Sequence, residues 1–184
     1  MDWDKVLIVK NKLDYARGKR PPVACILCAV AANDPEVDIL VVHRGKRHFI
    51  TLNLYPYNPG HVMVVPYSHH ETTRTLDREE VLEMHELSLL CMEVLEQEYN
   101  ARGFNVGFNL GPTSGASIPH LHQQIVPRYP NEIGFFEIFS EARVIVEDPQ
   151  ITRERMDAAF QKAAPVFFEN RSQGRPSGHK GPAG

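Results

Sequence analysis

The sequence predicts a single α+β domain in which an antiparallel sheet carries helices on one side. Strand-like runs precede and follow one long helical pattern in the order β-β-β-α-β-β, and most connections have the length of hairpin loops. No internal repeat is visible. With 184 residues, 42% of them hydrophobic, the chain is long enough to bury a core.

Three strands are expected in the N-terminal half. Residues 38–42 (DILVV) and 48–54 (HFITLNL) flank a turn-like stretch and predict a hairpin. A proline-rich loop over 54–60 leads into a third, largely buried strand over 61–66 (HVMVVP). Residues 1–24 are polar with two consecutive prolines, so we expect a short helix there and then an extended arm.

A long helix is expected to begin at Asp77, because Glu80 follows in the spacing of a capping box. Apolar residues then recur at helical intervals. They are Val81, Met84, Leu87, Cys91 and Leu95. The stretch from Asn100 to Gly103 predicts the end of the helix.

Two more strands and a last helix complete the predicted order. Residues 105–111 (NVGFNLG) alternate as a strand, and 111–117 (GPTSGAS) form a loop of small residues. Residues 120–126 (HLHQQIV) predict the last strand, and 151–168 predict a C-terminal helix.

Composition and charge narrow the functional classes. We expect one domain over 1–170 and a disordered tail over 171–184, which has too few apolar residues to pack. A net charge of −3 gives no general attraction to nucleic acid or to an anionic membrane. No apolar run approaches the ~20 residues that span a bilayer, and the N-terminus lacks the apolar block of a signal peptide. These features predict a cytoplasmic protein.

The last predicted strand carries an unusual row of polar side chains. Alternation along a strand places His120, His122 and Gln124 on one face, while Leu121 and Ile125 face the core. Two imidazoles and an amide in a row are poor core residues, because each needs a buried partner. A neutral imidazole is a competent nucleophile toward phosphorus, and the backbone amides of the preceding loop could approach a phosphate. The alternative is an edge strand with solvated histidines.

Three segments carry a resemblance to a known family. HLHQQIVPR resembles the histidine-triad signature, and Asn53–Pro66 (NLYPYNPGHVMVVP) and NVGFNLG match in the same order. The resemblance covers roughly residues 25–150 and is closest to the adenylyltransferase-like branch, which includes diadenosine tetraphosphate phosphorylases. It implies the histidine-triad fold, a five-stranded antiparallel sheet with helices packed on it. It also implies a homodimer and an adenine nucleotide as substrate.

The resemblance also implies residue roles. His122 would form a covalent nucleotidyl intermediate, and Gln124 would bind the non-bridging oxygens of the α-phosphate. The other implied contacts to the nucleotide are Asn109 and Ser117 with the amides of Gly115 and Ala116 for the phosphates, Asn53 for the ribose, and His61 as a supporting group. The alternative for His61 is a buried histidine whose ring nitrogens are satisfied by the backbone. Tyr55 and Tyr57 could flank the substrate, but we expect them to pack in the core.

Gln124 departs from the usual pattern, which has a third histidine at this position. Glutamine there is similar to the transferase branch of the superfamily. An amide can only hydrogen-bond, whereas histidine can donate a proton to a poor leaving group. A polyphosphate is already a weak base and needs little protonation. The alternative is that hydrolysis is retained despite the change.

Cys25 and Cys28 have the spacing of a zinc knuckle, in which two thiolates share one ion. The resemblance implies His69 and His120 as the other ligands of a closed, structural zinc site, with the adjacent His70 as a competitor for His69. The alternative is a metal-free pair of reduced core cysteines. The remaining histidines are expected at the surface; they are His43, His48, His85 and His179.

We therefore expect an enzyme that cleaves dinucleoside polyphosphates by double displacement, with phosphate as acceptor. Two alternatives stay open: a histidine-triad nucleotide hydrolase, and a nucleotide-binding sensor with little turnover.

Overall fold

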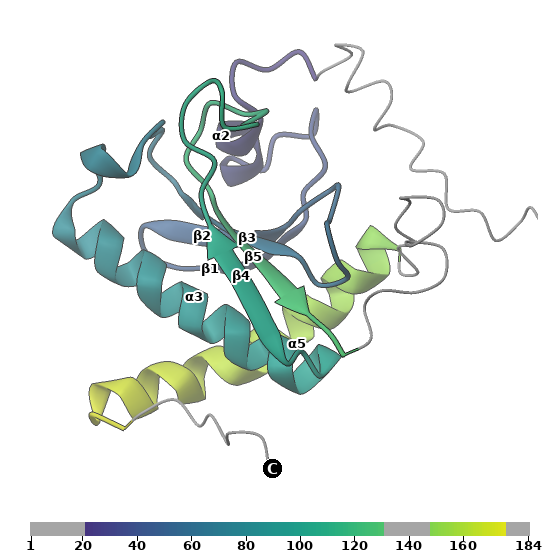
Figure 1. Ribbon diagram of the computed structural model, residues 1–184, viewed down its shortest axis with the longest axis vertical. Helices are drawn as coiled ribbons and strands as arrows, with labels where there is room; N and C mark the ends of the chain where they lie inside the picture. Colours follow the sequence, from purple (N-terminus) through teal and green to yellow (C-terminus); the bar gives the residue numbers. More distant parts are fainter. Residues whose placement is uncertain (1–20, 131–147, 176–184) are drawn as a thin grey trace, which may run out of the picture.

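The computed structural model describes residues 21–130 and 148–175 (Figure 1). The short helix expected near the N-terminus and residues 176–184 of the expected tail lie outside these ranges. Across the described residues, no helix has both the length and the apolar character needed to cross a membrane.

A five-stranded antiparallel sheet forms the centre of the fold, which confirms the predicted α+β class. Its spatial order is β1-β2-β3-β5-β4. The strands are β1 (Val41–Arg44), β2 (His48–Leu52), β3 (Val62–Pro66), β4 (Gly103–Gly107) and β5 (Gln123–Arg128). In the register between β3 and β5, Val62 faces Ile125 and Met63 faces Gln124.

Four predicted strand limits are wrong. β1 covers 41–44 rather than 38–42, and β2 ends at Leu52 rather than at residue 54. β4 covers 103–107 rather than 105–111, and β5 begins at Gln123 rather than His120. His120 and His122 therefore precede the strand, because the amide of Leu121 between them bonds to the carbonyl of His70 (2.5 Å) instead of to a neighbouring strand.

The long helix α3 (Arg78–Tyr99) begins and ends as predicted. The Asp77 side chain and Glu80 form a reciprocal capping box, and Asn100 closes the helix in the left-handed conformation (φ 53°). The prediction that Val81 packs in the core is wrong, since this residue is 52% exposed. The C-terminal helix α5 (Pro149–Ser172), capped by Asp148, extends past the predicted 151–168.

Two apolar clusters lie on opposite faces of the sheet. α3 packs on β2, β3 and β5, and α5 packs on β1 and α3, so both cover one face (Figure 1). Ile125 and Leu121 contribute to the core on that face, as alternation predicted. The short helix α2 (Ile26–Ala31) packs with Met63 and Phe49 on the other face, which corrects the expectation of helices on one side only.

Candidate functional site

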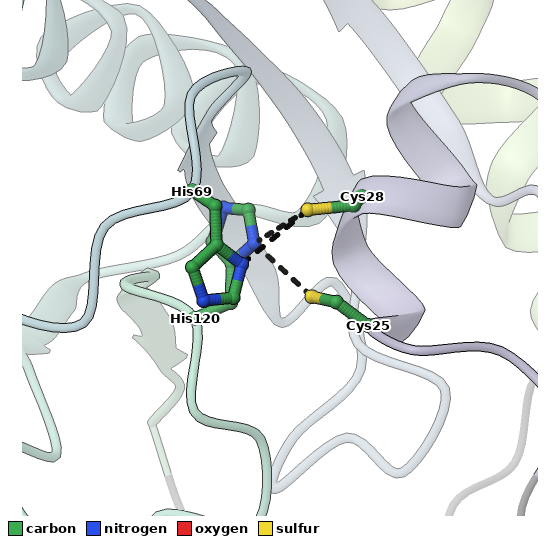
Figure 2. Close-up of side chains that lie close together, drawn as sticks. All are labelled: Cys25, Cys28, His69 and His120. Carbon is green, nitrogen blue, oxygen red and sulfur yellow. Dashed lines mark hydrogen bonds between the residues drawn. The ribbon is translucent and has the colours of Figure 1, made fainter.

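Four predicted metal ligands lie together on the α2 side of the sheet. Cys25 is the N-cap of α2 and Cys28 lies in its first turn, while His69 follows β3 and His120 precedes β5. Their ligand atoms all lie within 4.8 Å of one another. Figure 2 shows the two imidazoles facing the two sulfur atoms. Segments that are far apart in sequence thus build one compact donor set.

The distances in this set suit a tetrahedral ion. Nδ1 of His120 lies 3.3 Å from Sγ of Cys25 and 3.4 Å from Sγ of Cys28, and Nδ1 of His69 lies 3.4 Å from Sγ of Cys28. Zinc bonds of about 2.3 Å to sulfur and 2.0–2.1 Å to nitrogen place two such ligands roughly 3.5 Å apart. The spacing and the soft donors therefore fit a zinc-like cation.

Burial disfavours the charged forms of the groups in this cluster. It raises the pKa of the Cys28 thiol to about 11, with a smaller contribution from the neighbouring Cys25. Burial lowers the pKa of His120 to about 4, so its imidazole is neutral. Its Nε2–H donates to the carbonyl of Pro66 (3.1 Å), which leaves Nδ1 as the ligand atom.

His70 is held away from the cluster. Its Nδ1 lies 2.8 Å from Oγ1 of Thr75, and its Nε2 lies 3.2 Å from Oε1 of Glu80 at the start of α3. Its carbonyl accepts the Leu121 amide described above. His69 thus lies in the cluster, whereas His70 bonds to Thr75, Glu80 and the Leu121 amide and holds the chain next to His120.

His122 lies two residues after His120, and its other ring nitrogen is the one bonded to a backbone carbonyl. Its Nδ1 is 2.7 Å from the carbonyl oxygen of His120, and because a carbonyl only accepts, Nδ1 carries the proton. The lone pair of the neutral ring is then on Nε2, and the side chain is half-buried rather than enclosed. Gln124 faces Met63, on the same side of the sheet as α2.

His61 lies just before β3 and is 1% exposed. Its Nδ1 accepts a hydrogen bond from the amide of Tyr57 (3.2 Å), and the Tyr57 ring stacks on it at 5.2 Å between centroids. Burial and the nearby His122 lower the pKa of His61 to about 4, against an opposing contribution from a side-chain hydrogen bond with Gln124. Its Nε2 makes no hydrogen bond of regular geometry among the described residues.

The loop before β3 is shaped to present His61. Gly60 has a φ of +77°, and a Cβ there would lie 2.8 Å from the side chain of Leu95, so only glycine fits. Asn58 donates to the carbonyl of Pro127 (2.8 Å), and Tyr129 donates to that of Pro59 (2.7 Å). These bonds attach the loop to the end of β5.

Asn53 lies beside His61. Its backbone amide donates to the His61 carbonyl (3.0 Å), and its Oδ1 accepts from the amide of Tyr55 (2.9 Å), so Nδ2 is the group left for a ligand. Asn53 and His61 line a small pocket together with Pro149 and Thr152 of α5.

The residues expected to bind phosphates lie in the segment between β4 and β5. Gly115 (φ +83°) and Ser117 are exposed, and Ala116 and Asn109 are half-buried. Their contacts to phosphate stay predictions.

Two expectations about aromatic residues are wrong. His48 is 0% exposed, not at the surface, because Glu83 of α3 accepts its Nδ1–H (3.0 Å) along with the amides of Lys46 and Arg47. Tyr57 is 52% exposed rather than in the core. His43 is half-buried against Phe160, and His85 is exposed as predicted.

The sequence reasoning missed the backbone groups that orient the histidines. They are the carbonyls of Pro66, His70 and His120 and the amide of Tyr57. Only the contact of the Tyr57 amide could have been predicted from the sequence. The Pro59-Gly60 turn lies between Tyr57 and His61 and brings these two residues together.

Comparison with known proteins places this geometry in context. The family model described as HIT domain matches residues 34–131. A relative called AP-4-A phosphorylase, from Mycobacterium tuberculosis, is 41% identical over 116 residues, which cover 62% of this chain and 58% of the relative. The bis(5'-adenosyl)-triphosphatase of Saccharomyces cerevisiae is 32% identical over 106 residues, covering 51% and 47%. The chain thus spans about half the length of the curated relatives it matches.

Solved structures with low sequence identity share the fold. A Zn-bound histidine triad family protein from Mycobacterium smegmatis aligns with a TM-score of 0.62 at 19% identity, covering 78% of this chain and 97% of that one. A hypothetical histidine triad nucleotide-binding protein from Sulfolobus tokodaii aligns with a TM-score of 0.65 at 21% identity, covering 83% and 100%.

Proposed function

Because the chain belongs to the HIT domain family, we propose that it is a nucleotidyltransferase that cleaves dinucleoside polyphosphates through His122. The names of the two curated relatives, AP-4-A phosphorylase and bis(5'-adenosyl)-triphosphatase, support this substrate class.

The hydrogen bond from Nδ1 of His122 to the His120 carbonyl is the observation that carries the proposal. It leaves the lone pair on Nε2, which attacks the α-phosphorus of the substrate. A bond forms between Nε2 and phosphorus, and the bond to the bridging oxygen breaks, so the remaining polyphosphate leaves with the electron pair. The ring becomes positively charged, and the His120 carbonyl stabilises the Nδ1–H of that cation.

Gln124 decides the second step of the proposal. Its amide donates to the non-bridging oxygens of the α-phosphate but cannot remove a proton from water. Inorganic phosphate is already ionised and needs no base, so its oxygen attacks phosphorus and displaces Nε2. For diadenosine tetraphosphate the products are then ATP and ADP. Asn53, with Nδ2 available, would contact the ribose.

We further propose that Cys25, Cys28, His69 and His120 bind a structural zinc ion. Two sulfurs and two imidazole nitrogens leave no open coordination position, so the ion would fix the geometry of the site and take no part in the reaction. By holding His120, it also fixes the carbonyl that orients His122. We also propose a homodimer, which light scattering would test.

The proposed acceptor is tested by product analysis. With diadenosine tetraphosphate, millimolar phosphate should raise turnover and shift the products from AMP plus ATP to ADP plus ATP. Gln124→His, which restores an acid–base group, should move the partition back toward AMP.

Chromatography of the products separates the rival functions. If wild-type protein makes AMP and no ADP at every phosphate concentration, it is a hydrolase, as the name of the yeast relative would suggest. If no adenylyl donor is cleaved although nucleotides bind tightly, the chain is a nucleotide sensor.

A further inference from the structure

His61 combines two features that the proposed chemistry does not yet use. Its ring is almost fully enclosed at 1% exposure, and its Nε2 has no hydrogen-bond partner within the described part of the chain. An unsatisfied buried polar group costs free energy of folding. A native structure therefore generally retains one only where a further group bonds to it or where it has a functional role.

The tautomer of His61 follows from its other nitrogen. The amide of Tyr57 can only donate, so Nδ1, 3.2 Å away, must accept with its lone pair. The ring is neutral, since burial lowers the pKa of His61 to about 4. A neutral ring whose Nδ1 is unprotonated carries its hydrogen on Nε2. The Nε2–H of His61 is therefore a hydrogen-bond donor that needs an acceptor.

The sheet register brings an acceptor within reach. Gln124 lies directly opposite Met63, and His61 precedes Met63 by two residues, so both side chains belong to the same face. Such diagonal neighbours on adjacent strands have Cα atoms about 7–8 Å apart, which a glutamine side chain can span. Both Gln124, through a side-chain hydrogen bond, and His122 affect the pKa of His61, so the three side chains lie close together.

We propose that His61 is a positioning residue that fixes the amide orientation of Gln124. The Nε2–H of His61 donates to Oε1 of Gln124, so the NH₂ group of Gln124 points away from His61 toward the α-phosphate. A free amide could present either its oxygen or its nitrogen to the phosphate, and the oxygen would repel it. The chain of bonds from the Tyr57 amide through His61 removes that choice. This inference rests on the proposed function for its kinetic consequence but not for its structural one.

The structural consequence is tested by nitrogen-15 NMR of the histidine-labelled, zinc-loaded protein near pH 7. His61→Asn identifies the His61 signals. The inference expects a bare Nδ1 and a protonated Nε2 on His61; a proton on Nδ1 overturns it. This result does not depend on turnover, so it decides the tautomer even if the proposed activity fails.

The kinetic consequence is tested with a matched pair of variants. His61→Asn keeps an acceptor for the Tyr57 amide but loses the donor at Nε2, and it should lower kcat roughly 10–100-fold with little change in KM. That loss is below the roughly 10²–10³-fold cost of deleting a transition-state donor outright. His61→Gln, whose amide nitrogen can replace Nε2, should recover most of the rate.

A double-mutant cycle separates positioning from general support of the fold. In a Gln124→Ala background, His61→Asn should have no further effect on kcat, since there is no amide left to orient. An equal loss in both backgrounds, or no recovery with His61→Gln while the variants unfold like wild type, overturns the inference.

Discussion

His120 and His122 are separated by one residue, yet their surroundings give them opposite chemistry. His120 is 2% exposed, donates from Nε2 to the carbonyl of Pro66, and directs Nδ1 at two thiols. His122 is half-buried, donates from Nδ1 to the carbonyl of His120, and keeps Nε2 for a ligand. In each ring one nitrogen donates to a backbone carbonyl, which leaves the lone pair of the other nitrogen for a metal ion or a substrate.

Tautomer, rather than residue type, divides this short segment into a proposed metal-binding part and a proposed reactive part. The two parts are also connected, because the carbonyl that orients His122 belongs to His120. We expect this connection to act mainly in one direction. A disturbance at the cluster moves the carbonyl that orients the reactive ring, whereas removing the His122 side chain leaves all four proposed ligands in place.

The largest effect is expected for His122→Ala. Turnover of diadenosine tetraphosphate should fall by at least ~10³-fold, because the covalent step loses its nucleophile. Nucleotide affinity, measured by calorimetry, should stay within about an order of magnitude, since most binding contacts are made elsewhere. Zinc content should be unchanged.

His85→Ala is the matched control, because His85 is exposed on α3. It should retain both activity and zinc. Wild-type turnover in His122→Ala would remove the proposed mechanism, and loss of zinc in that variant would contradict the one-way connection.

The next largest effect is expected for Cys28→Ser. Wild-type protein should contain close to one zinc per chain by elemental analysis, and the variant should lose it. Metal binding is coupled to folding, so the loss should cost about 2–3 kcal/mol, or roughly 4–12 °C in melting temperature for a domain of this size. Turnover should also fall, because His120 is no longer held.

Cys91→Ala controls for the loss of a thiol as such, because Cys91 lies on the core-facing side of α3, is buried, and lies outside the cluster. It should keep its zinc. Stoichiometric iron, or no metal at all in wild type purified under reducing conditions, would rule out the zinc site.

Local signals were enough to predict much of this arrangement. Alternation put Leu121 and Ile125 in the core, and the capping box located the start of α3, because both depend on residues close in sequence. The CxxC spacing and the family resemblance together named four ligands that lie within 4.8 Å.

What could not be predicted depends on contacts between distant segments. His48 was expected at the surface, but Glu83 on α3, 35 residues away, accepts its Nδ1–H and allows its burial. The strand β5 begins late because the carbonyl of His70 takes the Leu121 amide. Every residue has the same backbone carbonyl, so the bonds that select the tautomers of His120 and His122 leave no pattern in the sequence.

The smallest effect concerns acid stability and His61. The folded pKa of His61 is about 4, below the ordinary value of 6.5, mainly because of burial. Between these values the unfolded chain binds a proton that the folded ring excludes, so the free energy of unfolding falls as pH falls. One such group contributes a slope of up to about 1.4 kcal/mol per pH unit, and its contribution is fully present above pH 6.5.

His61→Asn removes this titration, so the slope of unfolding free energy between pH 6.5 and pH 4.5 should be shallower than in wild type by up to one proton. Urea unfolding at several pH values measures it, and slopes rather than absolute stabilities are compared because the substitution has its own cost at pH 7. Identical slopes in the two proteins would mean that His61 accepts its proton while folded, and the lowered pKa of His61 would then be wrong.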